Sequence, residues 1–354
     1  MHGRRKAGSI SRFYSDMRSL GVDRWLYPTD RGLYCAPADL YLDPARPVAR
    51  AIITHGHSDH ARAGHDAVLA TPETVEVMKL RLGTDGAGRF EAAPYGETRT
   101  LGGVTVRLVP AGHVLGSAQV VLEWQGQRAV VSGDYKRAPD PTCAPFELVP
   151  CDVFVTEATF ALPVFRHEPA EQEVGRLLAS IARNPERTHL VGAYGLGKAQ
   201  RVMRLARDAG YDAPIFLHGA LVEMTALYER LGVTLGDVRP VPLDAKPADF
   251  AGALVLCPPS ALGDRWSRRF ADPVTAFASG WMRIRGRIRQ AGVELPLVIS
   301  DHADWPELIA TVTETGAEDV WVTHGRDDAL VYELARRGRK ARALSLVGFE
   351  DEGE

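Results

Sequence analysis

The sequence predicts an α/β protein, and two observations support this fold class. Short β-branched apolar runs recur along the chain, among them ARAIIT (49–54), AQVVLEW (118–124), CDVFVTE (151–157) and DVWVTHG (319–325). Stretches with the apolar spacing of helices separate many of these runs. With 354 residues, 45% of them apolar and 25% charged, the chain has an ordinary globular composition and the length for two domains or for one domain with a large insertion.

The expected elements differ between the first part of the chain and the middle. From about residue 33 to 135 strands outnumber helices, and VVLEWQGQRAVVSGD has the pattern of a hairpin that turns at Gln125 and Gly126. Between about 165 and 290 strands and helices alternate more regularly. The expected helices of the whole region are 72–82, 171–183, 198–209 and 220–231.

Charge and cysteine content exclude several classes of protein. The net charge of -3 argues against a protein that coats nucleic acid, because such proteins are strongly basic. No apolar run could span a bilayer, and the start MHGRRKAGSISRFY lacks the apolar core of a secretion signal, so we expect no membrane association and a cytoplasmic location. The four cysteines form no CxxC pair, which indicates neither a disulfide framework nor a thiolate zinc site.

Arginine is concentrated in MRIRGRIRQ (282–290). In an extended strand, Arg283, Arg285, Arg287 and Arg289 would project from one face and form a charged row. Such a row could contact the phosphates of a nucleic acid without reading its sequence. The alternative is a solvated surface that binds nothing.

Acidic residues and histidines follow the apolar runs, at the points where strands are expected to end. They are His55, His113, Asp134, Glu157, His302 and His324. In α/β proteins, ligand-binding and catalytic groups gather beyond strand ends, because a rigid sheet aligns several loops at one edge. These residues are therefore expected to meet, although they span much of the chain.

The segment AIITHGHSDHAR (51–62) places three histidines and an aspartate within six positions. A strand that ends at Thr54 can direct His55 and His57 to one metal ion. Asp59 and His60 then face a second ion. Two ions about 3.5 to 4 Å apart can stabilise both the attacking and the leaving oxygen of a displacement at phosphorus.

Two such ions need a shared ligand. Asp134 in VVSGDYK is the best candidate, because a carboxylate can bridge two ions with its two oxygens whereas an imidazole cannot. His113 in AGHVLGSA would complete the first site, and His324 in THGRDD the second. Taken alone, Asp134 is a turn residue after Gly133, and only its combination with the histidine loop favours a metal role.

These motifs resemble those of a known superfamily. HxHxDH, AGHVLGSA and SGD are similar to motifs of the metallo-β-lactamase superfamily. TEATF (156–160), SDHADW (300–305) and VTHG (322–325) resemble the three further motifs of its β-CASP branch, which includes Artemis-like DNA nucleases and the endonuclease of messenger RNA cleavage and polyadenylation. GAYGLGKAQRVM and SGWMRIRGR are closer still to bacterial ligase-associated DNA exonucleases, which are manganese-dependent, and the resemblance runs from about Gly32 to Ser345.

The resemblance implies a fold and a division of the chain. The fold is a four-layer αββα metallo-β-lactamase sandwich with an inserted α/β β-CASP domain. Residues 1–164 would form the first part of the metallo-β-lactamase domain, 165–295 the insertion, and 296–354 the C-terminal return to the first domain.

The resemblance also implies roles for individual residues. The ligands of the two ions would be His55, His57, His113 and Asp134 for the first, and Asp59, His60, Asp134 and His324 for the second. Asp43 would support the histidine loop from behind. His302 would be the general acid, and Glu157 would orient it. Lys198 and Arg201 in GLGKAQR would contact phosphate, with helix capping as the alternative.

The implied function is a metal-dependent DNA nuclease that acts on single-stranded or flap DNA in repair. A hydroxide bridging two divalent ions would attack the phosphorus and His302 would protonate the leaving oxygen, which gives a 5′-phosphate and a 3′-hydroxyl. Manganese is the expected metal, with zinc and iron as alternatives. A functional association with a DNA ligase and a helicase is implied, and the oligomeric state is left open.

Three alternatives remain open. The nearest is an RNA-processing endonuclease or exonuclease of the same branch, because His324 is present as in RNA-processing members, whereas DNA nucleases of the Artemis kind lack a metal-binding histidine there. A small-molecule hydrolase such as a thioesterase or lactonase would require neither Glu157 nor His302 nor the insertion. A non-catalytic nucleic-acid binder is expected to have lost metal ligands, and every expected ligand position here is filled.

Overall fold

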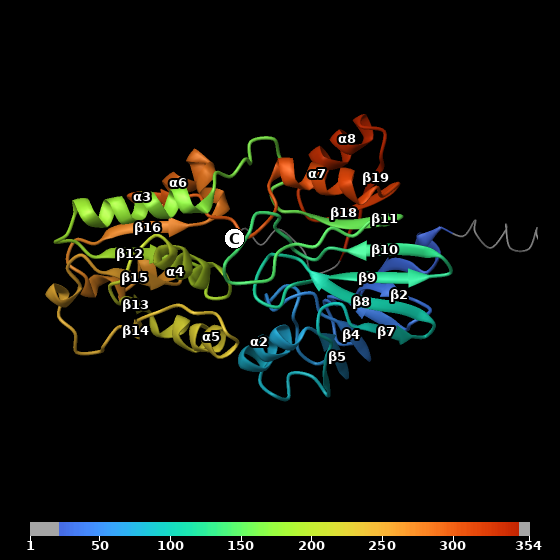
Figure 1. Cartoon of the computed structure of the whole chain (residues 1–354), viewed down its shortest axis with the longest axis horizontal. Coiled ribbons are helices and arrows are strands. Elements are labelled where there is room, and N and C mark those ends of the chain that lie inside the picture. Colours follow the sequence, from blue (N-terminus) through green and yellow to red (C-terminus); the bar gives the residue numbers. More distant parts are fainter. Residues whose placement is uncertain (1–20, 347–354) are drawn as a thin grey trace, which may run out of the picture.

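The computed structural model describes residues 21–346, which fold into three β-sheets in two lobes (Figure 1). Two sheets form the lobe on the right of Figure 1, and the third sheet forms the lobe on the left. The predicted domain limits at residues 1 and 354 lie outside the described residues, and the boundaries at 164 and 295 stay predictions.

The first sheet begins after a 3-10 helix, η1 (Val22–Arg24). Its strands lie in the order β1 (Leu26–Thr29), β2 (Gly32–Cys35), β3 (Leu40–Leu42), β4 (Arg50–Ile52), β5 (Ala67–Ala70) and β6 (Phe90–Ala92). The pairs among β1, β2 and β3 are antiparallel, and those from β3 to β6 are parallel. Helix α2 (Pro72–Leu82) covers the outer face, where Ile53, Val68 and Met78 are buried together.

The second sheet packs against the first. Its strands lie in the order β19 (Lys340–Ala343), β18 (Asp319–Gly325), β11 (Val153–Ala158), β10 (Gln127–Val131), β9 (Ala118–Trp124), β8 (Val104–Pro110) and β7 (Thr98–Leu101). Trp25, Val106 and Trp321 belong to the core between the two sheets. Helices α7 (Trp305–Thr315) and α8 (Asp328–Arg336) pack on its outer face. The order helix, sheet, sheet, helix confirms the predicted αββα sandwich.

The predicted hairpin joins β9 and β10. Their antiparallel register pairs Trp124 with Gln127, so that Gln125 and Gly126 form the turn. Both turn residues have positive φ angles, 50° and 78°, as a tight two-residue hairpin turn requires. The sequence prediction of this hairpin is therefore confirmed.

The third sheet is parallel throughout. Its strands lie in the order β14 (Val238–Pro240), β13 (Ile215–Leu217), β15 (Leu254–Cys257), β12 (His189–Gly192), β16 (Val274–Ala278) and β17 (Leu295–Leu297). One core cluster joins the sheet to α3 (Ala170–Arg183), α4 (Lys198–Asp208) and α5 (Gly219–Arg230), close to the predicted bounds. A second cluster includes residues of η2 (Pro247–Phe250) and η3 (Pro259–Leu262), with η4 (Ser267–Arg269) between Trp266 and Phe270.

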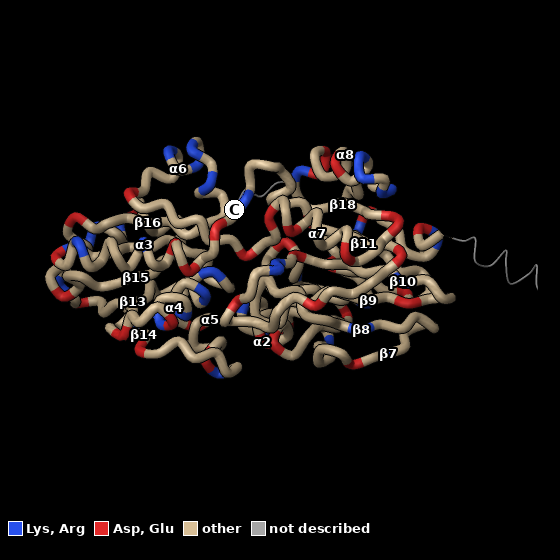
Figure 2. Tube along the Cα trace, turned by 45° about the horizontal axis from the view of Figure 1, so that its top comes forward, with Lys and Arg blue, Asp and Glu red and all other residues tan. Residues whose placement is uncertain are grey.

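The arginine-rich stretch is helical, so the expected extended row is wrong. It forms η5 (Gly280–Arg283) and α6 (Arg285–Ala291), which Figure 2 shows with basic residues gathered along them. The chain must cross over between the parallel strands β16 and β17, and a helix is the usual crossover. Gly292, at φ 62°, ends α6. In a helix, neighbours three or four positions apart share a face, so the arginines point in different directions.

Within residues 21–346, no helix combines the length and the apolar composition that a bilayer crossing requires.

Candidate metal centre

The acidic residues and histidines predicted at strand ends meet where the two lobes face each other. They form three groups whose candidate ligand atoms lie within 4.8 Å of one another. The groups are His55, His57, His113 and Asp134; then Asp59, His60 and His324; then Asp134, Glu157 and His302. The expectation that these distant segments converge is therefore fulfilled.

Asp43 holds the histidine loop in place. It follows β3, is buried, and has a positive φ of 41°. Its Oδ1 accepts a hydrogen bond from Thr54 N (2.8 Å), and its Oδ2 accepts from Thr54 Oγ1 (2.6 Å). His60 Nδ1 also lies 2.7 Å from Asp43 Oδ2, which fixes the proton on Nδ1 and turns Nε2 toward the centre. Asp43 therefore supports the loop from behind, where the sequence placed it.

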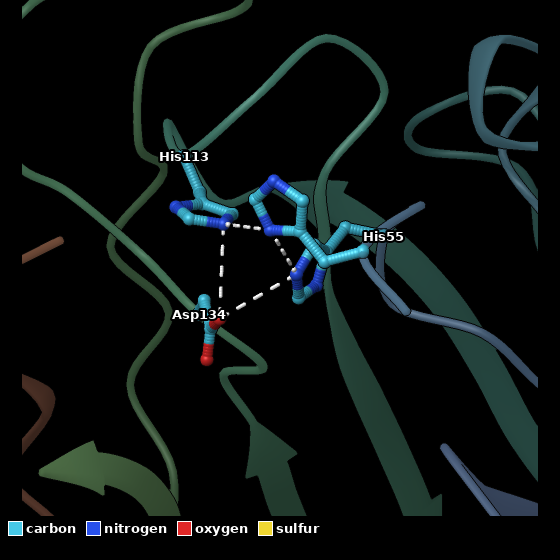
Figure 3. Close-up of side chains that lie close together, drawn as sticks. His55, His113 and Asp134 are labelled. Atoms are coloured by element: carbon cyan, nitrogen blue, oxygen red, sulfur yellow. Dashed lines mark hydrogen bonds and ion pairs between the residues drawn. The ribbon is translucent and has the colours of Figure 1, made fainter. Parts of the chain in front are cut away.

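The first group encloses a small space with its nitrogen and oxygen atoms (Figure 3). His57 Nδ1 lies 3.1 Å from His55 Nε2 and 3.0 Å from His113 Nε2. Asp134 Oδ2 lies 3.4 Å from His55 Nε2 and 3.7 Å from His113 Nε2. Ligands of a tetrahedral ion with bonds of about 2.0 to 2.1 Å are themselves about 3.3 Å apart. These four side chains therefore fit a divalent ion.

The second group lies on the other side of Asp134. His60 Nε2 is 3.5 Å from Asp59 Oδ2 and 3.5 Å from Asp134 Oδ2. His324 Nε2 is 3.7 Å from Asp59 Oδ2 and 3.8 Å from Asp134 Oδ1. Two imidazoles and two carboxylates with this spacing suit a divalent ion such as manganese or zinc. Asp134 is therefore within reach of both groups.

The ring nitrogens that face away from the centre have their own acceptors. His57 Nε2 lies 3.2 Å from Leu196 O, and His113 Nδ1 lies 2.8 Å from Asp301 O. A metal-binding histidine in proteins usually donates its second N–H to such a carbonyl or carboxylate, which fixes the ring and its tautomer. Both carbonyls follow strands of the third sheet. The lobe that contains this sheet therefore orients two histidines of the other lobe.

The pKa shifts of two buried histidines and of Asp134 suit a metal centre, whereas neighbouring carboxylates outweigh burial and raise the pKa of His60 well above its usual value. Burial lowers the pKa of His55 and of His113 well below the usual value, so both rings are neutral at pH 7. Burial alone would raise the pKa of Asp134, but His60 and His324 hold it well below its usual range. Neutral imidazoles and an ionised carboxylate are the forms that bind metals.

Glu157 and His302 form a pair beside the metal groups. His302 Nδ1 lies 2.9 Å from Glu157 Oε2, and Glu157 Oε1 accepts a hydrogen bond from Tyr135 N (2.7 Å). All three residues are buried. His302 Nδ1 also lies 4.0 Å from Asp134 Oδ2. The carboxylate of Glu157 therefore fixes the orientation of a ring that borders the centre.

Lys198 and Arg201 lie in a buried ion network. The sequence analysis had these two side chains contact phosphate instead. Both are in α4, and they are 1% and 4% exposed. Lys198 Nζ lies 2.9 Å from Ile299 O and 3.0 Å from Asp301 Oδ2. Arg201 Nη1 donates to Ser300 O and lies 3.2 Å from Asp301 Oδ1. The two basic side chains therefore hold the segment 299–301, which leads to His302.

Asp301 links this network to the metal groups. Its backbone oxygen is the acceptor for His113, and its carboxylate is held by the two basic residues of α4. Burial would raise the pKa of Asp301, but Lys198 and Arg201 hold it well below its usual range. Asp140 pairs with Arg201 Nε (3.2 Å) and Lys136 Nζ (2.6 Å) and completes the network. The sequence analysis missed Lys136, Asp140 and Asp301.

A cleft of about 620 Å³ borders both metal groups and His302. Arg81, Arg287 and Arg326 contribute basic side chains to its lining, whereas the exposed Arg283 and Arg285 do not line it. Arg81 Nη1 donates to Gly56 O in the histidine loop. The sequence analysis missed Arg81 and Arg326, although Arg326 follows His324 by two positions.

The fold and the site together define a class of protein. An αββα sandwich whose strand ends carry groups of histidine and aspartate that fit divalent ions is a metallohydrolase fold. Residues 35–192 match the family model described as the metallo-beta-lactamase superfamily, and the chain contains a domain of this superfamily.

Several curated proteins are similar to the chain. A protein of Opitutus terrae named probable DNA ligase is 29% identical over 325 residues, which cover 90% of this chain and 31% of that protein. Endoribonuclease YSH1 of Eremothecium gossypii is 25% identical over 95% of this chain and 55% of its own length. The RNase J-like protein of Methanocaldococcus jannaschii is 27% identical over 52% of this chain and 50% of its own length. The chain thus spans about a third to a half of the length of these relatives.

A solved structure is similar in fold. The crystal structure of a protein of unknown function from Enterococcus faecalis superposes with a TM-score of 0.55 and 13% identity, over 85% of this chain and 80% of that chain.

We expect Lys198→Met to destabilise the protein by about 3 kcal/mol, because it removes one partner of the buried Asp301 carboxylate. The matched control is Arg204→Met in the same helix, where the exposed pair with Asp208 (2.9 Å) contributes about 0.3 to 0.5 kcal/mol. Urea denaturation measures both variants. Equal losses of stability in the two variants would contradict the structural role of the network.

Proposed function

We propose that the protein is a metal-dependent nuclease that hydrolyses phosphodiester bonds in single-stranded or flap DNA. One observation carries the proposal: two groups of candidate metal-binding side chains both reach the Asp134 carboxylate and border a cleft lined by His302, which Glu157 holds. A small ester needs no second acid–base pair, whereas a phosphodiester has a poor leaving group that requires a proton. The relatives named as nucleases support the same reaction class.

Two divalent ions would be held by the two groups. His55, His57, His113 and Asp134 would hold one, and Asp59, His60, His324 and Asp134 the other. When bound, the ions supply an activated water and neutralise charge on the phosphate oxygens. We propose manganese, with zinc and iron as alternatives, because the donor set of imidazole and carboxylate suits all three.

His302 acts as the general acid. Its Nδ1 is held by Glu157 Oε2 at 2.9 Å, so its Nε2 is the atom from which a proton passes to the leaving oxygen. Proton transfer to the 3′-oxygen gives a 3′-hydroxyl and a 5′-phosphate. Glu157 positions the ring through this contact.

The arginines of the cleft bind the phosphate backbone. Arg81, Arg287 and Arg326 line it with three positive charges around the metal groups, and guanidinium groups suit phosphate geometry. Arg283 and Arg285 are exposed on η5 and α6, the segment that contributes Arg287 to the cleft, and add further contacts to the backbone. Such contacts position a strand without reading its sequence.

Two relatives bear on the substrate and on the partners. A protein named probable DNA ligase contains a segment similar to 90% of this chain, which supports DNA as the substrate and a functional association with ligation. The relatives named as endoribonucleases support RNA as the second candidate. Association with a helicase stays a prediction.

Parallel assays of DNA and RNA test the substrate. End-labelled single-stranded DNA, flap DNA, duplex DNA and RNA of one sequence are incubated with manganese, zinc or magnesium. We expect cleavage of single-stranded and flap DNA that requires a divalent metal and stops with a chelator. Cleavage of RNA alone would replace DNA with RNA, and hydrolysis of a small thioester or lactone without any nuclease activity would overturn the proposal.

We expect His302→Gln to lower kcat by about 10² to 10⁴-fold while the metal content stays unchanged, because the variant loses the proton donor and keeps every proposed ligand. Steady-state kinetics and elemental analysis of the purified variant measure the two quantities. His218→Asn, in the partly exposed residue that caps α5, is the control and should match the unmodified protein. Loss of metal from His302→Gln would make His302 a ligand and not the acid.

A further inference from the structure

Part of the cleft lining is apolar and aromatic. Leu162, Val164, Phe165, Trp281 and Ile284 belong to it, and Val164 is 50% exposed. Side chains of this kind contribute nothing to phosphate binding, which the arginines and the metal groups serve. The flat faces of nucleobases, by contrast, stack on aromatic rings and guanidinium groups.

Trp281 and Arg287 form a pair within this lining. Arg287 Cζ lies 5.1 Å from the centroid of the Trp281 ring, and both side chains are partly buried and border the cleft. The backbone N–H of Trp281 donates to Ser279 Oγ (3.3 Å) at the start of η5. Phe165 meets the tryptophan ring edge-on, with centroids 5.3 Å apart and planes at 89°. Contacts with Phe165 and Arg287 therefore hold the tryptophan ring in the absence of a ligand.

Phe160 connects this pair to His302. The centroid of the Phe160 ring lies 5.0 Å from that of Trp281 and 6.0 Å from that of His302. A Cβ atom at position 280 would lie 2.5 Å from the Phe160 ring, so Gly280 permits the close approach of η5 to this ring. The Trp281–Arg287 pair is thus one aromatic ring away from the general acid of the proposed reaction.

We propose that Trp281 and Arg287 form a stacking platform for one nucleobase, that of the nucleotide whose 3′-oxygen leaves. This inference rests on the proposed function, because the leaving oxygen must lie beside His302. The nucleotide on the 5′ side of the broken bond carries that oxygen, and its base is the one that reaches the platform on the same side of the centre. Stacking tolerates every base, so the platform selects a nucleotide with a base and not a sequence.

A binding experiment tests the platform without cleavage. Fluorescence anisotropy is measured with manganese present, using a labelled single-stranded oligonucleotide whose linkages are replaced by a non-hydrolysable phosphodiester analogue, which prevents turnover. We expect about tenfold weaker binding for Trp281→Ala and near-normal binding for Trp281→Phe, which keeps an aromatic face. Arg287→Lys should also weaken binding, because it keeps the charge and loses the planar guanidinium. Unchanged binding in Trp281→Ala overturns the platform.

Trp266 offers a matched control in the same lobe. It also has an arginine over its ring, with Arg269 Cζ 5.3 Å from the centroid, but it packs against Phe270 and His218 and does not line the cleft. Trp266→Ala should bind the oligonucleotide as the unmodified protein does. Circular dichroism and thermal unfolding of each variant separate a local loss of stacking from a loss of fold.

Abasic substrates test which nucleotide stacks. Each oligonucleotide has one cleavable phosphodiester and one abasic residue, which lies on either the 5′ or the 3′ side of that bond. The oligonucleotides are DNA or RNA, according to the result of the parallel assays. We expect the unmodified protein to lose about tenfold in kcat/KM with the 5′ abasic substrate and little with the 3′ one. For Trp281→Ala, kcat/KM should be the same with the 5′ abasic substrate as with the intact substrate, because this variant already lacks the platform.

The outcomes separate this inference from the proposed function. Equal losses on the two sides, or a further loss in Trp281→Ala, overturn the assignment of the base while nuclease activity stands. If the unmodified protein cleaves no nucleic acid at all, the proposed function fails, and the anisotropy measurement still decides whether the pair binds a base.

Discussion

The buried carboxylate of Asp134 is the group on which the arrangement of the site depends. It is 3% exposed, and ring nitrogens of five histidines lie within 4.0 Å of its oxygens. An ionised carboxylate in a protein interior costs several kcal/mol unless its charge is balanced. His60 and His324 balance this charge in the structure, and a bound divalent cation would do so in the proposed centre.

The fold meets this requirement by fixing each donor from behind. Asp43, which follows β3 of the first sheet, orients His60, and Glu157, in β11 of the second sheet, orients His302. The carbonyls of Leu196 and Asp301, which follow strands of the third sheet, orient His57 and His113. The lobe that contains the third sheet thus lines the cleft and also orients candidate metal ligands. The ion pairs of α4 with Asp301 connect this lobe to the segment that leads to His302.

The parts of the fold and of the site that depend on local sequence patterns could be predicted. The contacts between residues far apart in the sequence could not. The strand ends and the histidine loop are visible in the sequence because apolar runs stop at polar residues, and the hairpin at Gln125 has a local turn signal. The burial of Arg201 has no such signal, because Asp301 lies 100 positions away in the sequence. The arginine stretch alternates like a strand, but the crossover to β17 makes it helical. The place of Trp281 in the cleft has no local signal either, because its neighbour Phe165 is distant in the sequence.

The central claim is that Asp134 is shared by two metal ions. Crystals soaked in manganese and measured for anomalous scattering test it most directly, because each ion gives its own peak. The account predicts two peaks, one among His55, His57 and His113 and one among Asp59, His60 and His324, about 3.5 to 4 Å apart with the Asp134 carboxylate between them. A single peak, or two peaks of which neither contacts Asp134, would contradict it.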